Sequence, residues 1–124
     1  MTRGYRNLLV FQKAFSLAMD VFNLTKEFPS EEKFALTDQL RRSSRSVCRA
    51  IGEGYRKRQY PKHFSSKMSD ADMENSETQI SLDFAVACEY VSKEKHAALI
   101  LQSEEVGRIL NHMVANPEKF KPRD

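Results

Sequence analysis

Proline positions constrain this chain more than any other feature of its sequence. The four prolines stand at Pro29, Pro61, Pro117 and Pro122, and glycines are equally few. Proline breaks the interior of a helix, so each long proline-free stretch can hold continuous helical elements. Within these stretches the apolar residues recur at intervals of three and four. This spacing predicts helices rather than strands.

The apolar periodicity and the capping residues predict four helices. Asn7, Ser30 and Ser92 each stand where a helix is expected to begin. A chain of 124 residues, 40% of them hydrophobic, is the size of one domain, here 1–124. The short connections favour an all-α, antiparallel up-and-down four-helix bundle with a frayed tail over 117–124. The predicted helices are 8–27, 31–54, 62–90 and 93–115.

Composition and motifs exclude several classes of protein. No apolar run approaches the roughly 20 residues of a membrane span, so we expect a cytoplasmic protein with no membrane partner. The two cysteines, Cys48 and Cys88, lack metal-ligand spacing and are expected to be small core residues in a reducing compartment. No nucleophile motif, glycine-rich phosphate loop or Glu-x-x-His pair is present. We therefore expect no catalytic residues, no metal and no cofactor.

Positive charge is concentrated in one segment. From Arg41 to Lys67 there are nine lysines or arginines and one acid, Glu53, so this segment is net +8 and the remainder is net −5. Arg41, Arg45 and Arg49 recur every four residues, which gathers them on one side of a helix. Such a row can bind phosphate or pair with acids of the next helix.

A hairpin argument favours ion pairs for part of this row. If the second and third helices turn about Arg58, then Arg42 lies opposite Glu74 and Arg45 lies between Asp70 and Asp72. Bidentate pairing of arginine with carboxylate is easily satisfied, so pairing is favoured over phosphate binding at these two arginines. Charge reversal at Glu74 is then expected to destabilise the fold. The candidate ion-pair residues are Arg42, Arg45, Asp70, Asp72, Glu74 and Glu77.

The cations around the turn face few acids and alternate with the aromatic residues Tyr55, Tyr60 and Phe64. Positive charge with rings that stack on unpaired bases is the chemistry of single-strand nucleic-acid binding. A solvated linker with aromatics packed on the core, or a subunit contact, fits the same pattern. The candidate nucleic-acid-binding residues are Arg41, Arg49, Arg56, Lys57, Arg58, Tyr60, Lys62 and Lys67.

A catalytic alternative uses Arg58 and His63, whose spacing resembles the Arg-x4-His motif of HEPN-type ribonucleases. A histidine can exchange protons with the ribose hydroxyl while an arginine stabilises charge on the phosphorane. Pro61 lies inside the motif, which in those enzymes sits on a helix. We therefore rank this ribonuclease below a non-enzymatic binding protein.

Three stretches carry a resemblance to a known family. They are Tyr5, Leu8, Val10, Phe11, Gln12 and Ala14; then Phe28, Pro29 and Glu32; and finally 39–47 (QLRRSSRSV) with Ile51, Glu53 and Gly54. Together they resemble the four-helix-bundle proteins encoded within intervening sequences of bacterial 23S rRNA genes, also called S23-like proteins. The resemblance implies a ring-like homo-oligomer, a pentamer, without enzymatic activity. With the basic segment, it suggests RNA or a ribonucleoprotein as the partner.

Overall fold

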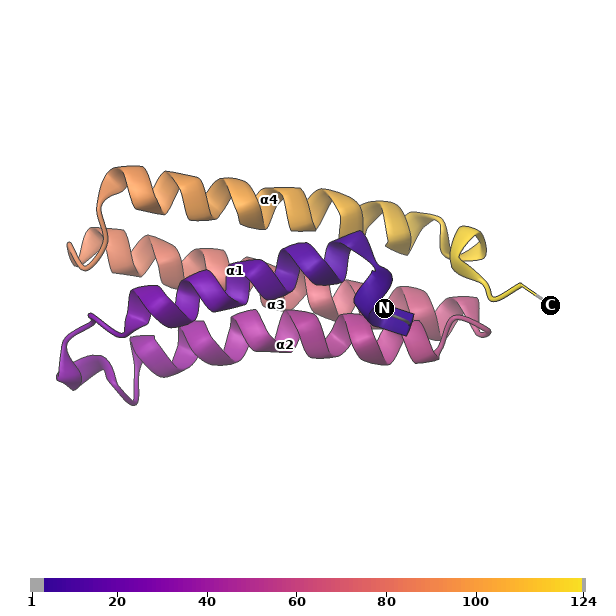
Figure 1. Ribbon diagram of the computed structural model, residues 1–124, viewed down its shortest axis with the longest axis horizontal. Coiled ribbons are helices and arrows are strands. Elements are labelled where there is room, and N and C mark those ends of the chain that lie inside the picture. Colours follow the sequence, from indigo (N-terminus) through magenta and orange to yellow (C-terminus); the bar gives the residue numbers. More distant parts are fainter. Residues whose placement is uncertain (1–3, 124) are drawn as a thin grey trace.

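Four antiparallel helices run up and down alongside one another in the computed structural model, which describes residues 4–123 (Figure 1). The termini beyond these limits, residues 1–3 and Asp124, lie outside the described residues, so the expected domain of 1–124 is described here without them. The long helices are α1 (Leu9–Thr25), α2 (Leu36–Arg56), α3 (Pro61–Ala87) and α4 (Lys93–Ala115). Three short 3-10 helices accompany them: η1 (Gly4–Asn7), η2 (Ser30–Glu32) and η3 (Pro117–Phe120).

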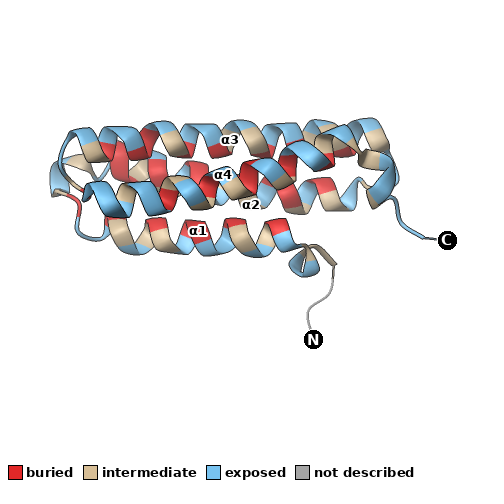
Figure 2. Ribbon diagram, turned by 90° about the horizontal axis from the view of Figure 1, so that it is seen from above, coloured by how far each residue is buried: buried red, intermediate tan, exposed pale blue. Residues whose placement is uncertain are grey.

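The core follows the predicted apolar stripes. Figure 2 shows the buried residues on the inner faces of the helices, with exposed residues covering the outside. One cluster, which includes Ile51, Phe64 and Met68, lies toward the end that holds the α2–α3 turn. A second cluster, which includes Leu40 and Leu82, lies toward the opposite end. Between the two apolar clusters lie buried polar residues, among them Asn75, Thr78 and Ser103.

The connection between α1 and α2 differs from the sequence-based expectation. The second helix was expected from residue 31, but Ser30–Glu32 forms a 3-10 turn and α2 begins only at Leu36. The residues between them are exposed, so no apolar contact holds them in a helix. Instead the Glu32 carboxylate accepts the backbone N–H of Leu36 at 3.3 Å and the Tyr90 hydroxyl at 2.9 Å. Glu32 thus ties this connection to the one between α3 and α4.

The break between α3 and α4 has a clear local cause. Glu89 has a positive φ of 63°, and the Tyr90 N–H reaches back to the Ala85 carbonyl, which is the hydrogen bond of a Schellman helix end. The new helix is capped by Ser92, whose hydroxyl accepts the Lys95 N–H at 3.0 Å, as the sequence predicted. Asn7 was also expected to cap a helix, but it belongs to η1, and Leu8 occupies the N-cap of α1.

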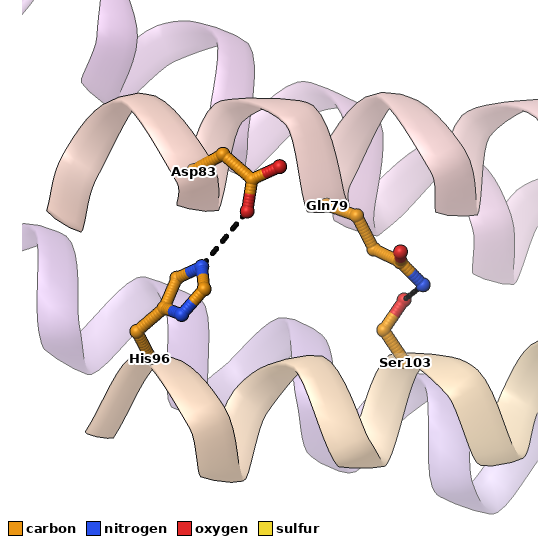
Figure 3. Close-up of polar contacts among 4 residues, drawn as sticks. All are labelled: Gln79, Asp83, His96 and Ser103. Atoms are coloured by element: carbon orange, nitrogen blue, oxygen red, sulfur yellow. Dashed lines mark hydrogen bonds and ion pairs between the residues drawn. The ribbon is translucent and has the colours of Figure 1, made fainter. Parts of the chain in front are cut away.

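Polar side chains join α3 to α4 at several levels (Figure 3). Asn75 and Ser103 exchange two hydrogen bonds, of 2.8 and 2.9 Å, and Gln79 donates to the Ser103 hydroxyl at 2.9 Å. Nearer the end of α3, the His96 ring and the Asp83 carboxylate are hydrogen-bonded at 2.8 Å on an exposed surface. The contacts of Asn75 and Ser103 satisfy buried polar groups only when the two helices lie in this register.

The tail is more ordered than expected. Residues 117–124 were predicted to fray, yet Pro117–Phe120 forms η3 and the Phe120 ring stacks on Phe64 with centroids 5.5 Å apart.

The cysteines also depart from expectation, because Cys48 is half-buried and Cys88 is exposed at the end of α3; both thiols are free. Within residues 4–123, no helix has the length and apolar character needed to cross a bilayer.

Candidate nucleic-acid interface

The fold brings three separate segments to one end of the bundle. Figures 1 and 2 both place the short helices η1 and η3 toward the end that carries the α2–α3 turn. Tyr5 of η1 packs against Gly52 of α2, where an added Cβ would lie 3.9 Å from the Tyr5 ring. On the other side, η3 is held by the stacking of Phe120 on Phe64. Residues far apart in sequence therefore share one surface.

This surface, called here the cationic end, comprises residues 4–7, 53–67 and 117–123. Within these ranges the acids are Glu53 and Glu118, and each is paired with a lysine: Glu53 with Lys67 and Glu118 with Lys121, both at 3.2 Å. The other seven lysines and arginines therefore have no unpaired acid within these three segments to neutralise them. The lysines and arginines of the cationic end are Arg6, Arg56, Lys57, Arg58, Lys62, Lys67, Lys119, Lys121 and Arg123.

Several predicted binding residues lie at the cationic end in accessible positions. Arg56, Lys57 and Lys62 are exposed, and no ion pair involves them in the described part of the chain. Tyr60 is 52% exposed and meets the His63 ring edge-on with centroids 6.0 Å apart. A ring that keeps half its surface in solvent can stack on an unpaired base.

Arg58 is held in a fixed conformation. Its guanidinium carbon lies 3.7 Å from the centroid of the Tyr55 ring, and its Nε donates to the Tyr55 carbonyl at 2.9 Å. This contact orients the guanidinium before any ligand arrives. The same contact engages the Arg58 side chain, which the ribonuclease alternative would need for catalysis. His63 lies on the first turn of α3, so the break between α2 and α3 separates it from Arg58.

Three residues expected near the interface lie elsewhere or are covered. Arg41 is close to the start of α2, where its Nε donates to the Thr25 hydroxyl at 2.8 Å and its guanidinium lies 4.8 Å from the Phe22 ring centroid. Phe64 is only 1% exposed and belongs to the core. Arg49 is exposed but lies about two turns before the end of α2. The cationic end therefore contains fewer of the predicted binding residues than the sequence suggested, because Arg41 and Arg49 lie outside it.

The expected ion pairs between α2 and α3 are not formed among the described residues. Arg42 pairs instead with Asp38 on its own helix, at 3.5 Å on an exposed surface. Arg45 lies 5.8 Å from the Phe22 ring centroid, on the side of α1. The register of the two helices explains part of this difference. Because Ser43 contacts Thr78, the residues that lie side by side are those equally far in sequence from the Tyr60–Pro61 bond, and not from Arg58 as expected.

The acids of α3 serve other contacts. Asp72 faces α4, since an added Cβ at Gly107 would lie 3.7 Å from its Oδ1. The pKa of Glu74 is raised, first by partial burial and then by the charge and hydrogen bond of Glu77 and the charge of Asp70; Arg42 lowers it. Arg42 is thus close to Glu74 as expected, but its influence there is smaller than that of the neighbouring acids.

A groove between α1 and α2 was not predicted from the sequence. It has a volume of about 580 Å³ and is lined on the α1 side by Phe11 and Phe15 and on the α2 side by Arg45, Arg49 and Arg56. The sequence did contain both walls of the groove, as a row of aromatic residues in the first helix and a row of arginines in the second. Only the three-dimensional packing shows that these rows face the same space.

Within residues 4–123, no three His, Cys, Asp or Glu side chains are placed to hold a metal ion.

Comparison with known proteins assigns the family. Residues 6–112 match the sequence model of the 23S rRNA-intervening sequence proteins, so the chain belongs to this family. A solved structure with the same fold is a protein of unknown function from the S23 ribosomal protein family of Bacteroides thetaiotaomicron. The two share 27% sequence identity with a TM-score of 0.77, over 86% of this chain and 98% of that one. No curated protein matches the chain.

Proposed function

We propose that this protein binds RNA, alone or in a ribonucleoprotein, through the cationic end and without cleaving it. The observation that carries this proposal is the gathering of nine lysines and arginines from three segments around two acids that are already paired. Such a surface attracts polyanions by releasing their counterions. Its exposed ring, Tyr60, adds a group that stacks on unpaired bases.

RNA is favoured over polyanions that lack phosphates for two reasons. The family is described by its association with 23S rRNA intervening sequences, which makes RNA the first ligand to test. In addition, Arg58 stacked on Tyr55 presents a preoriented planar cation, which suits a phosphate better than a diffuse field of lysines does.

A salt titration with paired charge reversals tests this proposal. Binding of a short single-stranded RNA should weaken with added salt, with a log-log slope near −0.7 for each phosphate contacted. Lys57→Glu with Lys62→Glu removes two contacts, so the slope should become shallower by about 1.4. Lys93→Glu with Lys95→Glu changes the charge equally at the opposite end of the bundle and is the control. Equal effects of the two pairs, or a slope of zero, would refute binding at the cationic end.

The absence of cleavage needs its own measurement. Arg58 already donates to the Tyr55 carbonyl, which supports a binding role over a catalytic one. RNA incubated with the protein should therefore remain intact. Cleavage that disappears in His63→Ala would instead establish the ribonuclease alternative, and cleavage that persists there would point to a different site.

We also propose that the chain acts as a ring-like homo-oligomer, a pentamer, as the family resemblance suggests. Support comes from three apolar side chains on the outer face of α3, Met73, Ile80 and Phe84, each more than half exposed. Exposed apolar rows of this kind mark protein interfaces. Sedimentation should give five times the 14.3 kDa chain mass, and Ile80→Glu with Phe84→Glu should lower it. Leu101→Glu, on α4, is the matched control.

A further inference from the structure

The groove between α1 and α2 has two chemically different walls. On the α1 side the rings of Tyr5, Phe11 and Phe15 follow one another, with centroids 4.8 and 6.0 Å apart. Phe15 is 52% exposed despite lying in this row. Aromatic surface left in water at the edge of a concave site is available to another flat, apolar group.

The opposite wall carries guanidinium groups at helical spacing. Arg45 and Arg49 are one turn apart on α2, about 6 Å along the axis, and Arg56 follows two turns later. Arg49 and Arg56 take part in no ion pair within residues 4–123. The acid that lines the groove, Glu53, is paired with Lys67 at 3.2 Å. The cations of this wall therefore remain available to an external anion.

These walls fit a ligand in which anionic groups and flat apolar groups run in parallel. An unpaired RNA strand has this chemistry, since its phosphates follow one edge and its bases the other. The groove also shares Arg56 with the cationic end, so a strand bound there can continue into it. A free phosphate would match only the arginine wall.

We propose that the α1–α2 groove holds an unpaired RNA segment, with bases against the Phe15 wall and phosphates on Arg45, Arg49 and Arg56. This inference rests on the proposed RNA binding and names the part of the RNA that is recognised: single-stranded, with accessible bases. The groove therefore selects unpaired over double-stranded RNA, whereas the cationic end attracts both.

The test compares a ligand that has bases with one that lacks them. A short oligouridylate and an inorganic polyphosphate of similar charge are bound to the full-length protein. Phe15→Ala should weaken oligouridylate binding about tenfold and leave polyphosphate binding unchanged. Arg49→Gln should weaken both, and Leu101→Ala, on α4, should change neither. Circular dichroism confirms that each variant remains folded.

A fluorescent substitution gives an independent readout. The chain contains no tryptophan, so Phe15→Trp introduces a single reporter into the groove. Oligouridylate should quench its emission by stacking, and polyphosphate should not. Leu101→Trp is the control, whose emission should not change.

Each other outcome overturns the inference in a recognisable way. If Phe15→Ala and Phe15→Trp are silent while Lys57→Glu with Lys62→Glu still weakens RNA binding, the groove is not used, although the proposed function stands. If Phe15→Ala lowers the mass of the native particle and leaves RNA affinity intact, a second copy of the chain occupies the groove. If the unaltered protein binds no oligouridylate, the inference and the proposed function both fail.

Discussion

Ser43 of α2 and Thr78 of α3 share a buried hydrogen bond of 2.8 Å between their hydroxyl groups. Thr78 also donates to the Glu74 carbonyl at 3.0 Å, and the Ser43 hydroxyl lies within donor distance, 3.4 Å, of the Leu40 carbonyl. Each hydroxyl thus has an acceptor on its own helix, whereas the bond between the two forms only at the one level where these residues meet. Sliding α3 along α2 by a turn would lose this bond, whose net contribution to stability is about 0.5–1.5 kcal/mol. The bond thus favours the observed register of the two helices.

Removal of this bond should be detectable as a loss of stability. Thr78→Val keeps the shape of the side chain but removes the bond between the helices, while the Ser43 hydroxyl keeps the Leu40 carbonyl at 3.4 Å, so the free energy of unfolding should fall by about 0.5–1.5 kcal/mol. Adding Ser43→Ala should lower it little further, because the bond that joins the helices is already lost. Urea unfolding measures both variants. The exposed Ser76→Ala is the control, and a Thr78→Val variant as stable as this control would contradict the role of the bond.

Two glycines at the end of α2 should respond oppositely to the same substitution. A Cβ at Gly54 would lie 2.6 Å from Met68 Cε and 3.1 Å from Lys67 Cβ, and Met68 is fully buried. Gly54→Ala should therefore lower the free energy of unfolding by about 1–2 kcal/mol. A Cβ at Gly52 would meet nothing closer than 3.9 Å, so Gly52→Ala should raise it by about 0.5–1 kcal/mol through helix propensity. Equal effects at the two positions in thermal unfolding would show that close packing at Gly54 does not matter.

The fold was predictable because its signals are local and repeated. Helical periodicity recurs along the long helices, although it is weaker in α3, and Ser92 caps α4 as its position indicated. The start of α2 was missed because Ser30, Glu31 and Glu32 have good helix-start chemistry, but Phe34 is exposed and no buried apolar side chain follows them before Leu36. The order of the tail was missed because Phe120 is stabilised by Phe64, which is distant in sequence.

The candidate site was only partly predictable. The contacts of a helical side chain depend on its position along the helix axis and also on the side of the helix to which it points. The ion pairs were predicted from the distance to the turn alone. Because Ser43 faces α3, Arg45 two residues later points roughly 200° away, toward Phe22 of α1. The same rotation turns Arg49 toward the groove that Phe15 also lines. No spacing within a single helix reveals which neighbour lies on each side.

The environment of Glu74 reverses the expectation that its charge stabilises the fold. Burial, Glu77 and Asp70 all raise its pKa, and only Arg42 lowers it. A carboxyl with a raised pKa in the folded state destabilises that state when it ionises. The penalty is complete above the folded pKa and disappears as pH falls through the unfolded pKa.

Glu74→Gln should therefore raise the stability of the protein at pH 7, by less than about 1 kcal/mol because the side chain is only partly buried. The gain should shrink as the pH is lowered into the acidic range, where the original carboxyl is protonated in both states. Chemical unfolding across this range measures the difference, with the exposed Glu104→Gln as the control. A loss of stability at pH 7 would mean that attraction to Arg42 dominates after all.

The two thiols should differ strongly in reactivity. Burial raises the pKa of Cys48 to about 11, whereas Cys88 is exposed at the end of α3. The thiolate is the reactive form, so a disulfide reagent at pH 7.5 should modify Cys88 more than about tenfold faster than Cys48. Single-thiol variants, Cys88→Ser and Cys48→Ser, separate the two rates. The rate of Cys48 should also rise with each unit of pH up to about 10, because ionisation limits it. Equal rates in the two variants would show that the Cys48 side of the α1–α2 groove opens readily to solvent.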